Sequence, residues 1–479
     1  MEILSVLAMV YQNKCFKING LTLFYGSLLG LFTSCLFQEQ VYVPLNADFI
    51  PSRTIVQAGD TVNFTNGSQV AVSFLWDFKD GTQSTQTNPQ HVFADTGRYA
   101  ITMVGTKRDN VTSDSMVKEV VVLPASKQAQ NTVLIEGVSG DKQGFRMTQL
   151  ADGHFVLAGR QNLGNLQVIK TLDGTTRLWE TDLNNLTRGQ LFVEAVKELS
   201  DGSIVVVGHY FDLVGASDAF IVKLDAGGKE SWRNKLATVD HEIYKDCMEG
   251  SNGSVLVLAS INQAQVQLNE YSSAGVLIKS KTFGETHVPE SMLWGQNAKM
   301  IIGGTNLGSS TPFVLQLDST LTQEKLQDLG FGGAISKVIQ LADGDLVVAG
   351  SQTIDSSRRA MIARVNVSSL ATVWLNNPMT YSKQASEEIF VDVVESGQNV
   401  FALGTHTNPL SNADVLVCKY GQTNEAISLE ALGIFGGNQA EQGWQLLLNG
   451  LTLFFIGETE SFSNAFKAIY FVQLDLNLE

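Results

Sequence analysis

The chain has 479 residues, of which 44% are hydrophobic and 17% are charged, and it carries a net charge of −16. This length allows two or three domains with ample cores. The acidic balance argues against nucleic-acid binding and against a broad surface for acidic polymers, because phosphate backbones attract basic patches. The 43 glycines against 8 prolines favour an exported all-β chain with many tight turns.

The first 34 residues have the pattern of a targeting segment. Lys14 and Lys17 precede an apolar stretch over 21–32, which runs into a serine and then Cys35. This arrangement resembles a bacterial lipoprotein signal, in which a cysteine after a small residue becomes the acylated N-terminus. The resemblance implies cleavage of residues 1–34 and lipid attachment at Cys35.

Two other interpretations of this segment stay open. Residues 20–37 reach the lower length limit for a membrane span, so an uncleaved anchor is one alternative, and ordinary cleavage without lipid is the other. The residues before Lys14 are themselves apolar, which leaves the start at either Met1 or Met9. With lipid attachment, residues 35–44 form a linker and the protein is held at a bacterial cell envelope, at the outer membrane or cell surface.

A small sandwich is predicted next. Three motifs indicate it: 76–81 (WDFKDG), 91–93 (HVF) and 97–104 (GRYAITMV). Trp76 and Phe78 alternate toward one face of a strand, the Asp-Gly pair forms a turn, and Tyr99, Ile101 and Met103 alternate on a later strand. These motifs resemble the PKD (polycystic kidney disease) domain. The resemblance implies an immunoglobulin-like β-sandwich whose motif residues are core and turn residues rather than ligands.

The sandwich is expected over 45–124, a polar linker over 125–130, and a repeat array over 131–479. Each repeat has a strand-like run, a tight turn, an all-apolar run that ends at a small residue, and a further apolar run. The seven small residues recur every 44 to 54 residues, near the period of four-stranded propeller blades: Gly159, Gly208, Ser260, Gly304, Gly350, Gly404 and Gly457.

The residues of each repeat predict its strands. Asp-Gly and Asn-Gly before the apolar run favour a two-residue hairpin turn, because both central positions need positive φ. An apolar run without alternation is expected of a strand covered on both faces. The small residue at its end fits a close backbone approach near a crowded axis. A fourth, outer strand with Trp or Leu completes the unit.

The two ends of the array predict its closure. The last repeat stops at Glu479 after its third strand, while an orphan segment, 132–138 (TVLIEGV), precedes the first repeat. We expect this segment to supply the outer strand of the last blade and so to leave no open edge.

The repeats resemble a unit of bacterial secreted and surface proteins, of the form DGGYIVAG…DAFLVKLDANGNVLW. The segments 342–350 (ADGDLVVAG) and 218–225 (DAFIVKLD), with Trp232, carry this resemblance. It implies a β-propeller but no single activity. The sequence thus predicts an all-β chain in which a PKD-like sandwich is followed by a seven-bladed β-propeller.

Catalytic and metal-binding motifs are weak, and we predict no catalytic, cofactor-binding or metal-binding residue. The six histidines lack metal-ligand spacing, and no nucleophile elbow or phosphate loop occurs. His209 and His406 follow closing glycines and are candidates to face the central channel, but they belong to well-separated blades. We therefore expect no shared histidine site.

The acidic pairs are the candidates for a glycosidase. Glu387 with Glu388, and Glu458 with Glu460, are close in sequence, and glycosidases place two carboxyl groups on either side of a sugar. No surrounding motif supports catalysis by either pair. Cys247 and Cys418 fall in separate repeats, so we expect buried thiols rather than a disulfide.

Loops at a propeller's channel mouth vary freely on a rigid scaffold. We therefore interpret the chain as a lipid-anchored binding protein, in which a PKD stalk presents a propeller to a glycan or a protein partner. A propeller hydrolase or lyase acting on polysaccharide is one alternative, and a structural envelope component is another. No cofactor is predicted.

Overall fold

The computed structural model describes residues 44–94, 97–123, 131–135, 142–161, 164–183, 189–211, 216–236, 238, 240–354, 357–377, 387–407, 413–436, 439–461 and 467–478. The predicted leader, with Cys35, lies outside these residues. The described chain consists of β-strands, turns and two short 3₁₀ turns, η1 (Ser251–Gly253) and η2 (Gln296–Ala298). This all-β architecture is the predicted one.

The N-terminal part is a sandwich of a three-stranded sheet, β1-β3-β6, and a five-stranded sheet, β2-β8-β7-β4-β5. Its strands are β1 (Phe49–Pro51), β2 (Ile55–Gln57), β3 (Thr61–Asn66), β4 (Ser73–Asp77), β5 (Gln83–Ser84), β6 (Gln90–Val92), β7 (Gly97–Thr106) and β8 (Ser113–Leu123). Aromatic side chains fill the space between the sheets, with the Trp76 ring edge-on to Phe49 at 5.1 Å between centroids.

The PKD-like motifs occupy the predicted places in this sandwich. Trp76, Phe78, Ile101 and Met103 are buried in one core. The Trp76 indole donates to the carbonyl of Gln86 at 2.8 Å, so its single polar atom is satisfied. The motif residues are therefore core residues, as the sequence predicts.

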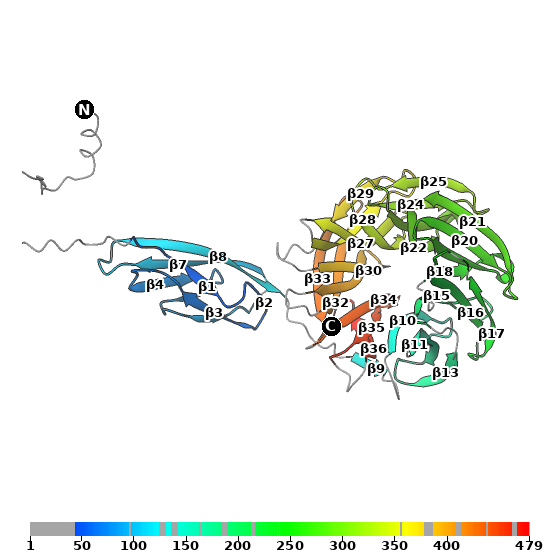
Figure 1. Cartoon of the computed structure of the whole chain (residues 1–479), viewed down its shortest axis with the longest axis horizontal. Helices are drawn as coiled ribbons and strands as arrows, with labels where there is room; N and C mark the ends of the chain where they lie inside the picture. The colour runs from blue at the N-terminus through cyan, green and yellow to red at the C-terminus, as the bar shows by residue number, and fades with distance from the viewer. Residues whose placement is uncertain are drawn as a thin grey trace, which may run out of the picture. The chain divides into compact units, whose positions relative to one another are not determined.

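The remaining strands form seven four-stranded antiparallel sheets, which we number 1 to 7 in chain order and which follow one another around a ring in Figure 1. Sheets 1 to 4 comprise β10 (Lys142–Gln149), β11 (Phe155–Gln161), β12 (Asn165–Thr171), β13 (Arg177–Leu183); β14 (Leu191–Glu198), β15 (Ile204–Phe211), β16 (Ser217–Leu224), β17 (Glu230–Leu236); β18 (Glu242–Glu249), β19 (Val255–Ile261), β20 (Gln265–Tyr271), β21 (Leu277–Glu285); and β22 (His287–Trp294), β23 (Met300–Asn306), β24 (Thr311–Leu317), β25 (Gln323–Asp328).

Sheets 5 to 7 comprise β26 (Ala334–Gln340), β27 (Leu346–Ile354), β28 (Ser357–Val365), β29 (Thr372–Asn376); β30 (Glu387–Ser396), β31 (Asn399–Thr407), β32 (Ala413–Gln422), β33 (Ile427–Phe435); and β34 (Glu441–Asn449), β35 (Thr452–Thr459), β36 (Ala468–Asp475), β9 (Asn131–Ile135). The predicted propeller is confirmed. Seven blades stay a prediction for the whole chain, since this count covers the described residues alone.

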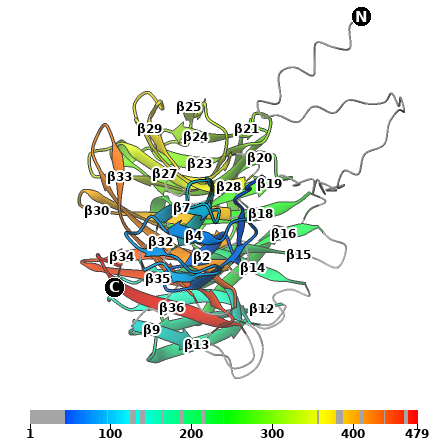
Figure 2. The same ribbon diagram turned by 90° about the vertical axis from the view of Figure 1, so that its left-hand side faces the viewer.

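Strand β9 closes the ring. It pairs antiparallel with β36, from Ile135 opposite Ile469 to Asn131 opposite Gln473, and Figures 1 and 2 both show it beside this last strand. The first repeat-array strand therefore completes the last sheet, as the two chain ends predict. Residues 136–138 of the predicted strand lie outside the described part of the chain.

The Asp-Gly hairpins differ from the predicted two-residue turns. Gly153 has a φ of +85°, but Asp152 is absent from the positive-φ residues, and the backbone N–H of Gly153 donates to Leu150. This is a type I turn followed by a glycine bulge, a three-residue loop. The Asp152 carboxylate holds it by accepting from His154 N at 3.0 Å. The predicted form does occur at Asn252-Gly253, where both φ values are positive.

Five of the predicted small residues lie against a backbone carbonyl oxygen of the neighbouring first strand, which is the close backbone approach that we predicted: Gly208, Gly304, Gly350, Gly404 and Gly457. A Cβ on Gly208 would lie 2.0 Å from the carbonyl oxygen of Phe192, where the neighbouring β14 is bulged. The glycine thus leaves room for the backbone of the bulged first strand. In sheet 3 the equivalent residue is Ala259, opposite Tyr244, and not the predicted Ser260.

Glycines in the outer turns seat aromatic side chains of the preceding sheet. A Cβ on Gly228 would lie 2.7 Å from the Trp179 ring, and one on Gly275 would lie 2.6 Å from the Trp232 ring. These turns therefore need glycine both for positive φ and for space. Trp179 thus joins sheet 1 to sheet 2, and Trp232 joins sheet 2 to sheet 3.

Candidate binding sites of the propeller

The first strands of the seven sheets surround a narrow channel at the centre of the ring. Each first strand is bulged against its neighbour, which turns an extra side chain out of the regular alternation. The channel has a volume of about 190 Å³ and is lined by Trp444 and by eight ionisable residues: Arg146, Glu194, Lys197, Lys245, Asp246, Glu290, Lys337 and Asp392.

Two of the channel carboxylates join neighbouring sheets. Asp246 accepts from Cys247 N at 2.9 Å and, across the sheet boundary, from Met292 N at 3.1 Å. Asp392 repeats this arrangement with Val393 N at 2.9 Å and Leu446 N at 2.8 Å. Their charges thus hold backbone groups around the channel.

The other two channel carboxylates have charged partners. Glu290 lies 2.9 Å from the Lys245 ammonium, and Glu194 lies 3.6 Å from Arg146 and 3.3 Å from His209. Burial favours the neutral form of Glu194, but His209, Lys245 and Arg146 outweigh it and lower its pKa to about 2. Burial raises the pKa of Glu290, against the opposing effect of Lys245.

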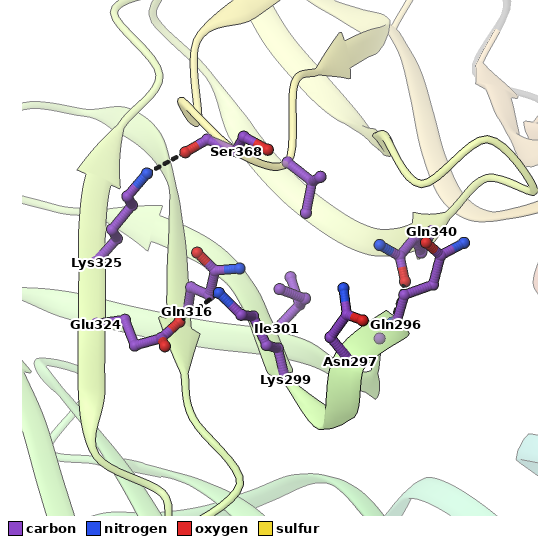
Figure 3. Close-up of a pocket in the computed structure, with 11 residues that line it drawn as sticks. Gln296, Asn297, Lys299, Ile301, Gln316, Glu324, Lys325, Gln340 and Ser368 are labelled. Carbon is purple, nitrogen blue, oxygen red and sulfur yellow. Dashed lines mark hydrogen bonds and ion pairs between the residues drawn. The ribbon is translucent and has the colours of Figure 1, made fainter.

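A larger cavity lies between sheets 4 and 5. It has a volume of about 410 Å³, and Figure 3 shows the side chains that surround it. Its polar groups are the amides Gln296, Asn297, Gln316 and Gln340, the ammonium of Lys325, and the ion pair of Lys299 with Glu324 at 2.9 Å. Ile301 and Val367 add an apolar surface.

Gln316 is the group of this cavity that the repeat does not explain. At equivalent register positions, Lys170 and Lys223 reach the Asp of their own hairpin turn, at 2.7 and 3.1 Å. In sheet 4 the pair is replaced by Gln316 and Asn297, and within the described residues neither side chain makes a hydrogen bond. Because sheet 4 lacks this ion pair, two amide side chains without hydrogen-bond partners in the described residues line an open cavity.

Our sequence analysis missed Gln316, although the signal was present. The third run of the repeat reads VIKT in sheet 1 and IVKL in sheet 2, but VLQL in sheet 4, where the turn also has Asn297 in place of Asp-Gly. A simultaneous change at two positions that contact each other in sheets 1 and 2 marks a lost pair.

Buried ionisable groups fill the boundaries between sheets 5, 6 and 7. Arg359 lies 3.4 Å from Glu388, which in turn lies 3.4 Å from His406 Nδ1, and all three are less than a tenth exposed. Asp414 and Glu441 are also buried, and both carboxyl groups lie against Gly436. Burial, and next the charge of Glu441, raise the pKa of Asp414 to about 6.

The structure gives the predicted acidic pairs different surroundings. Glu388 is buried against Arg359, whereas its neighbour Glu387 is exposed. Glu458 and Glu460 both bind Lys467, at 2.8 and 3.0 Å. A cavity of about 260 Å³ between sheets 6 and 7 does bring Glu387 and Glu458 together, together with the same lysine. These carboxylates are thus neighbours in space, although distant in sequence.

The histidine candidates occupy separate places. His209 stacks on Phe192 and approaches Glu194 at the channel, while His406 is buried between sheets. Cys247 and Cys418 are buried free thiols, as predicted, and burial raises the pKa of Cys418 to about 12. Within the described ranges, no group of three potential metal ligands is found, and no helix has the length and apolarity to cross a membrane.

Two protein-family models match segments of the chain, one in the sandwich and one in the propeller. Residues 46–121 match the PKD domain, and residues 199–229 match a family described as "Domain of unknown function (DUF5122) beta-propeller". Collagenase ColA of Bacillus cereus is 31% identical over 113 residues, which are 20% of this chain and 12% of the collagenase. The chain therefore spans a small part of that relative.

Solved structures resemble the chain only distantly. Polysaccharide lyase Uly1 has 9% identity and a TM-score of 0.47, with 72% of this chain and 92% of that chain covered. A quinonprotein alcohol dehydrogenase-like protein from Bacteroides thetaiotaomicron has 9% identity and a TM-score of 0.40, with 82% and 97% covered. Likenesses at this level carry no argument about activity.

Proposed function

Since the chain joins a PKD domain to a β-propeller, we propose that it is a binding protein whose propeller takes a glycan between sheets 4 and 5. The observation that carries this proposal is Gln316. The residue is 3% exposed, and its side chain lines the cavity and makes no hydrogen bond within the described residues. Water or a ligand in the cavity must therefore supply its partner.

The chemistry of the cavity fits sugar hydroxyl groups. An amide offers both donors and an acceptor, which matches a hydroxyl that also does both, and Gln316 and Asn297 provide two such groups. Ile301 and Val367 offer an apolar surface to the C–H face of a sugar ring. The volume of about 410 Å³ falls within the range of small-ligand sites.

Binding is favoured over catalysis in this cavity. Its single carboxylate, Glu324, is 2.9 Å from Lys299, whereas the hydrolase alternative requires two carboxyl groups with separate roles. The protein-partner alternative remains an outcome of the binding experiment.

The test is a glycan array followed by calorimetry with the purified full-length protein. We expect Gln316→Ala to weaken binding of the selected glycan about ten-fold, the loss of one well-placed hydrogen bond. Gln323→Ala is the matched control, because this amide is exposed on β25 outside the cavity and its loss should leave affinity unchanged.

A second variant introduces the lysine–aspartate pair that sheets 1 and 2 contain. The double substitution Gln316→Lys with Asn297→Asp places an ion pair across the cavity, so it should abolish glycan binding without loss of thermal stability. Retained affinity in this variant, or a protein partner captured at the same residues in place of a glycan, would show that the cavity is not a glycan site.

For attachment, we propose that Cys35 carries lipid and that the PKD domain is a stalk at a bacterial cell envelope. Acyl chains add about 0.8 kcal/mol for each buried CH₂ group, and stable anchoring takes more than one chain. Mass spectrometry of the mature N-terminus tests this. An acylated Cys35 is expected, together with an uncleaved leader in Cys35→Ser; an unmodified mature end elsewhere contradicts the proposal.

A further inference from the structure

We infer that the central channel is a second binding site, for a small oxyanion such as phosphate or the carboxylate of an acidic sugar. The inference is independent of the glycan cavity, which lies between sheets 4 and 5 and shares no lining residue with the channel. It rests on an imbalance between the hydrogen-bond donors and acceptors of the channel.

Four hydrogen-bond donor groups of the channel have no hydrogen-bond partner within the described residues. Lys197 and Lys337 line the channel, are partly exposed, and make no hydrogen bond or ion pair within the described residues. Two further groups, Arg146 Nη1 and Trp444 Nε1, are buried without a hydrogen-bond partner. Three of these groups come from the consecutive sheets 7, 1 and 2 and the fourth comes from sheet 5, so donors reach the channel from two sides.

The four carboxylates of the channel already have hydrogen-bond or ion-pair partners. Asp246 and Asp392 each accept two backbone N–H groups, one of them from the next sheet. Glu290 is bound by Lys245, and Glu194 is flanked by Arg146 and His209. The channel carboxylates therefore stabilise the ring itself, and what they leave for a ligand is mainly donors.

Lys337 stays charged in this setting. Burial opposes its charge, but the nearby carboxylates of Asp392 and Asp246 outweigh burial and raise its pKa. A neutral ligand gains little from an ammonium group, whereas an oxyanion forms short, charge-assisted hydrogen bonds with it. The unpartnered ammonium groups thus give a negative ligand stronger contacts than a neutral one.

The size of the channel and the charge of the chain limit the ligand to a small anion. A volume of about 190 Å³ admits an inorganic oxyanion or one acidic sugar unit, but not a folded segment. The net charge of −16 repels acidic polymers at long range. At physiological salt that repulsion is screened beyond about 8 Å, so the nearby lysines dominate for an ion inside the channel.

The test is calorimetric titration of the full-length protein with sodium phosphate, sodium glucuronate and sodium acetate at constant ionic strength. We expect saturable binding of phosphate or glucuronate. Tighter binding of glucuronate than of acetate assigns the site to a sugar-borne carboxylate, and tighter binding of phosphate assigns it to a free oxyanion. No saturable heat with any of the three anions overturns the inference.

Variants locate the site. Lys337→Met and Lys197→Met should each weaken anion binding by about ten-fold, because each removes one charge-assisted contact. Lys197 has no ion-pair partner within the described residues, so its replacement keeps the test valid even if Lys337→Met reduces folding. Lys279→Met, on the exposed part of β21, is the control. Equal affinity in all three variants would place the anion outside the channel and contradict the inference.

Discussion

Two boundaries between neighbouring sheets fill the same position with opposite chemistry. Between sheets 5 and 6, Arg359 of β28 meets Glu388 of β30, whereas between sheets 6 and 7, Asp414 of β32 meets Glu441 of β34. The register makes the positions equivalent, because Arg359 and Asp414 each lie opposite the residue two places after a closing glycine. The repeat thus fixes where two side chains meet but not their charges.

The difference shows how one scaffold position stabilises the ring at one boundary and makes it sensitive to pH at the next. A buried arginine and glutamate neutralise each other, and loss of either partner leaves an unpaired charge. Two buried carboxyl groups repel when both are ionised, so one of them retains a proton to a higher pH. A third boundary, between sheets 2 and 3, again joins two acids, Asp218 and Glu242.

The largest effect is expected from breaking the opposite-charge pair. Arg359→Met removes the arginine counter-charge of the buried Glu388 and should lower the free energy of unfolding by about 3–5 kcal/mol. Urea denaturation at pH 7 measures it. Arg358→Met is the matched control, since this neighbouring arginine is exposed and should change stability little. The double variant Arg359→Met with Glu388→Gln should recover part of this stability. Equal losses in Arg359→Met and Arg358→Met would contradict the pairing.

The acid pair should respond to pH in the opposite sense from a stabilising carboxylate. The pKa of Asp414 is about 6 in the folded chain, against 3.8 for an ordinary aspartate. Between about pH 4 and 6 the folded chain therefore retains a proton that the unfolded chain releases. The proton on Asp414 therefore favours the folded chain below pH 4, and this contribution to the free energy of unfolding is lost as the pH rises through 6.

Asp414→Asn removes this dependence and should stabilise the chain at pH 7 by at most about 3 kcal/mol, the value of a two-unit pKa shift. The measurement is the stability difference between variant and parent in urea from pH 4 to 8. That difference should rise up to about pH 6 and then level off. A difference that stays constant over this range would show that the two carboxyl groups do not share a proton.

The third boundary should respond in the same direction but less. Burial raises the pKa of Glu242, and Asp218 and Asp240 add to it, while a hydrogen bond from Thr238 opposes them. Glu242→Gln keeps the acceptor oxygen and removes the charge, so at pH 7 it should stabilise the chain by less than Asp414→Asn. Thermal unfolding of both variants side by side measures the order, and destabilisation by Glu242→Gln would contradict it.

The sequence predicted the parts of this fold that depend on apolar pattern. Buried second strands, the PKD-like core around Trp76, and ring closure by the orphan segment follow from runs of hydrophobic residues and from a missing strand. Turn geometry did not follow, because the Asp152 side chain binds its own turn and permits a negative φ that the Asp-Gly pair alone does not predict.

The candidate sites were less predictable, because they depend on contacts between sheets. Arg359 and Glu388 meet across a boundary that no local pattern marks, and the channel donors come from four sheets. Gln316 was within reach of the sequence, since the repeats that form sheets 1 and 2 have a lysine at the equivalent position. Comparison of repeats position by position would have found it.

The smallest effect is expected from an ion pair of the same chemistry placed in solvent. Arg177 and Glu180 lie 2.5 Å apart on the outer strand β13, with 38% and 29% of their side chains exposed. Exposed pairs contribute about 0.2–1 kcal/mol and are screened by salt, so Arg177→Met should cost less than about 1 kcal/mol at low salt and almost nothing at about 1 M salt. Urea unfolding of Arg177→Met and Arg359→Met at both salt concentrations measures this.

The loss of stability in Arg359→Met should persist in high salt, because burial protects its ion pair from screening. If salt reduced both losses equally, the boundary between sheets 5 and 6 would be open to solvent, and the contrast with the acid pair would not depend on burial.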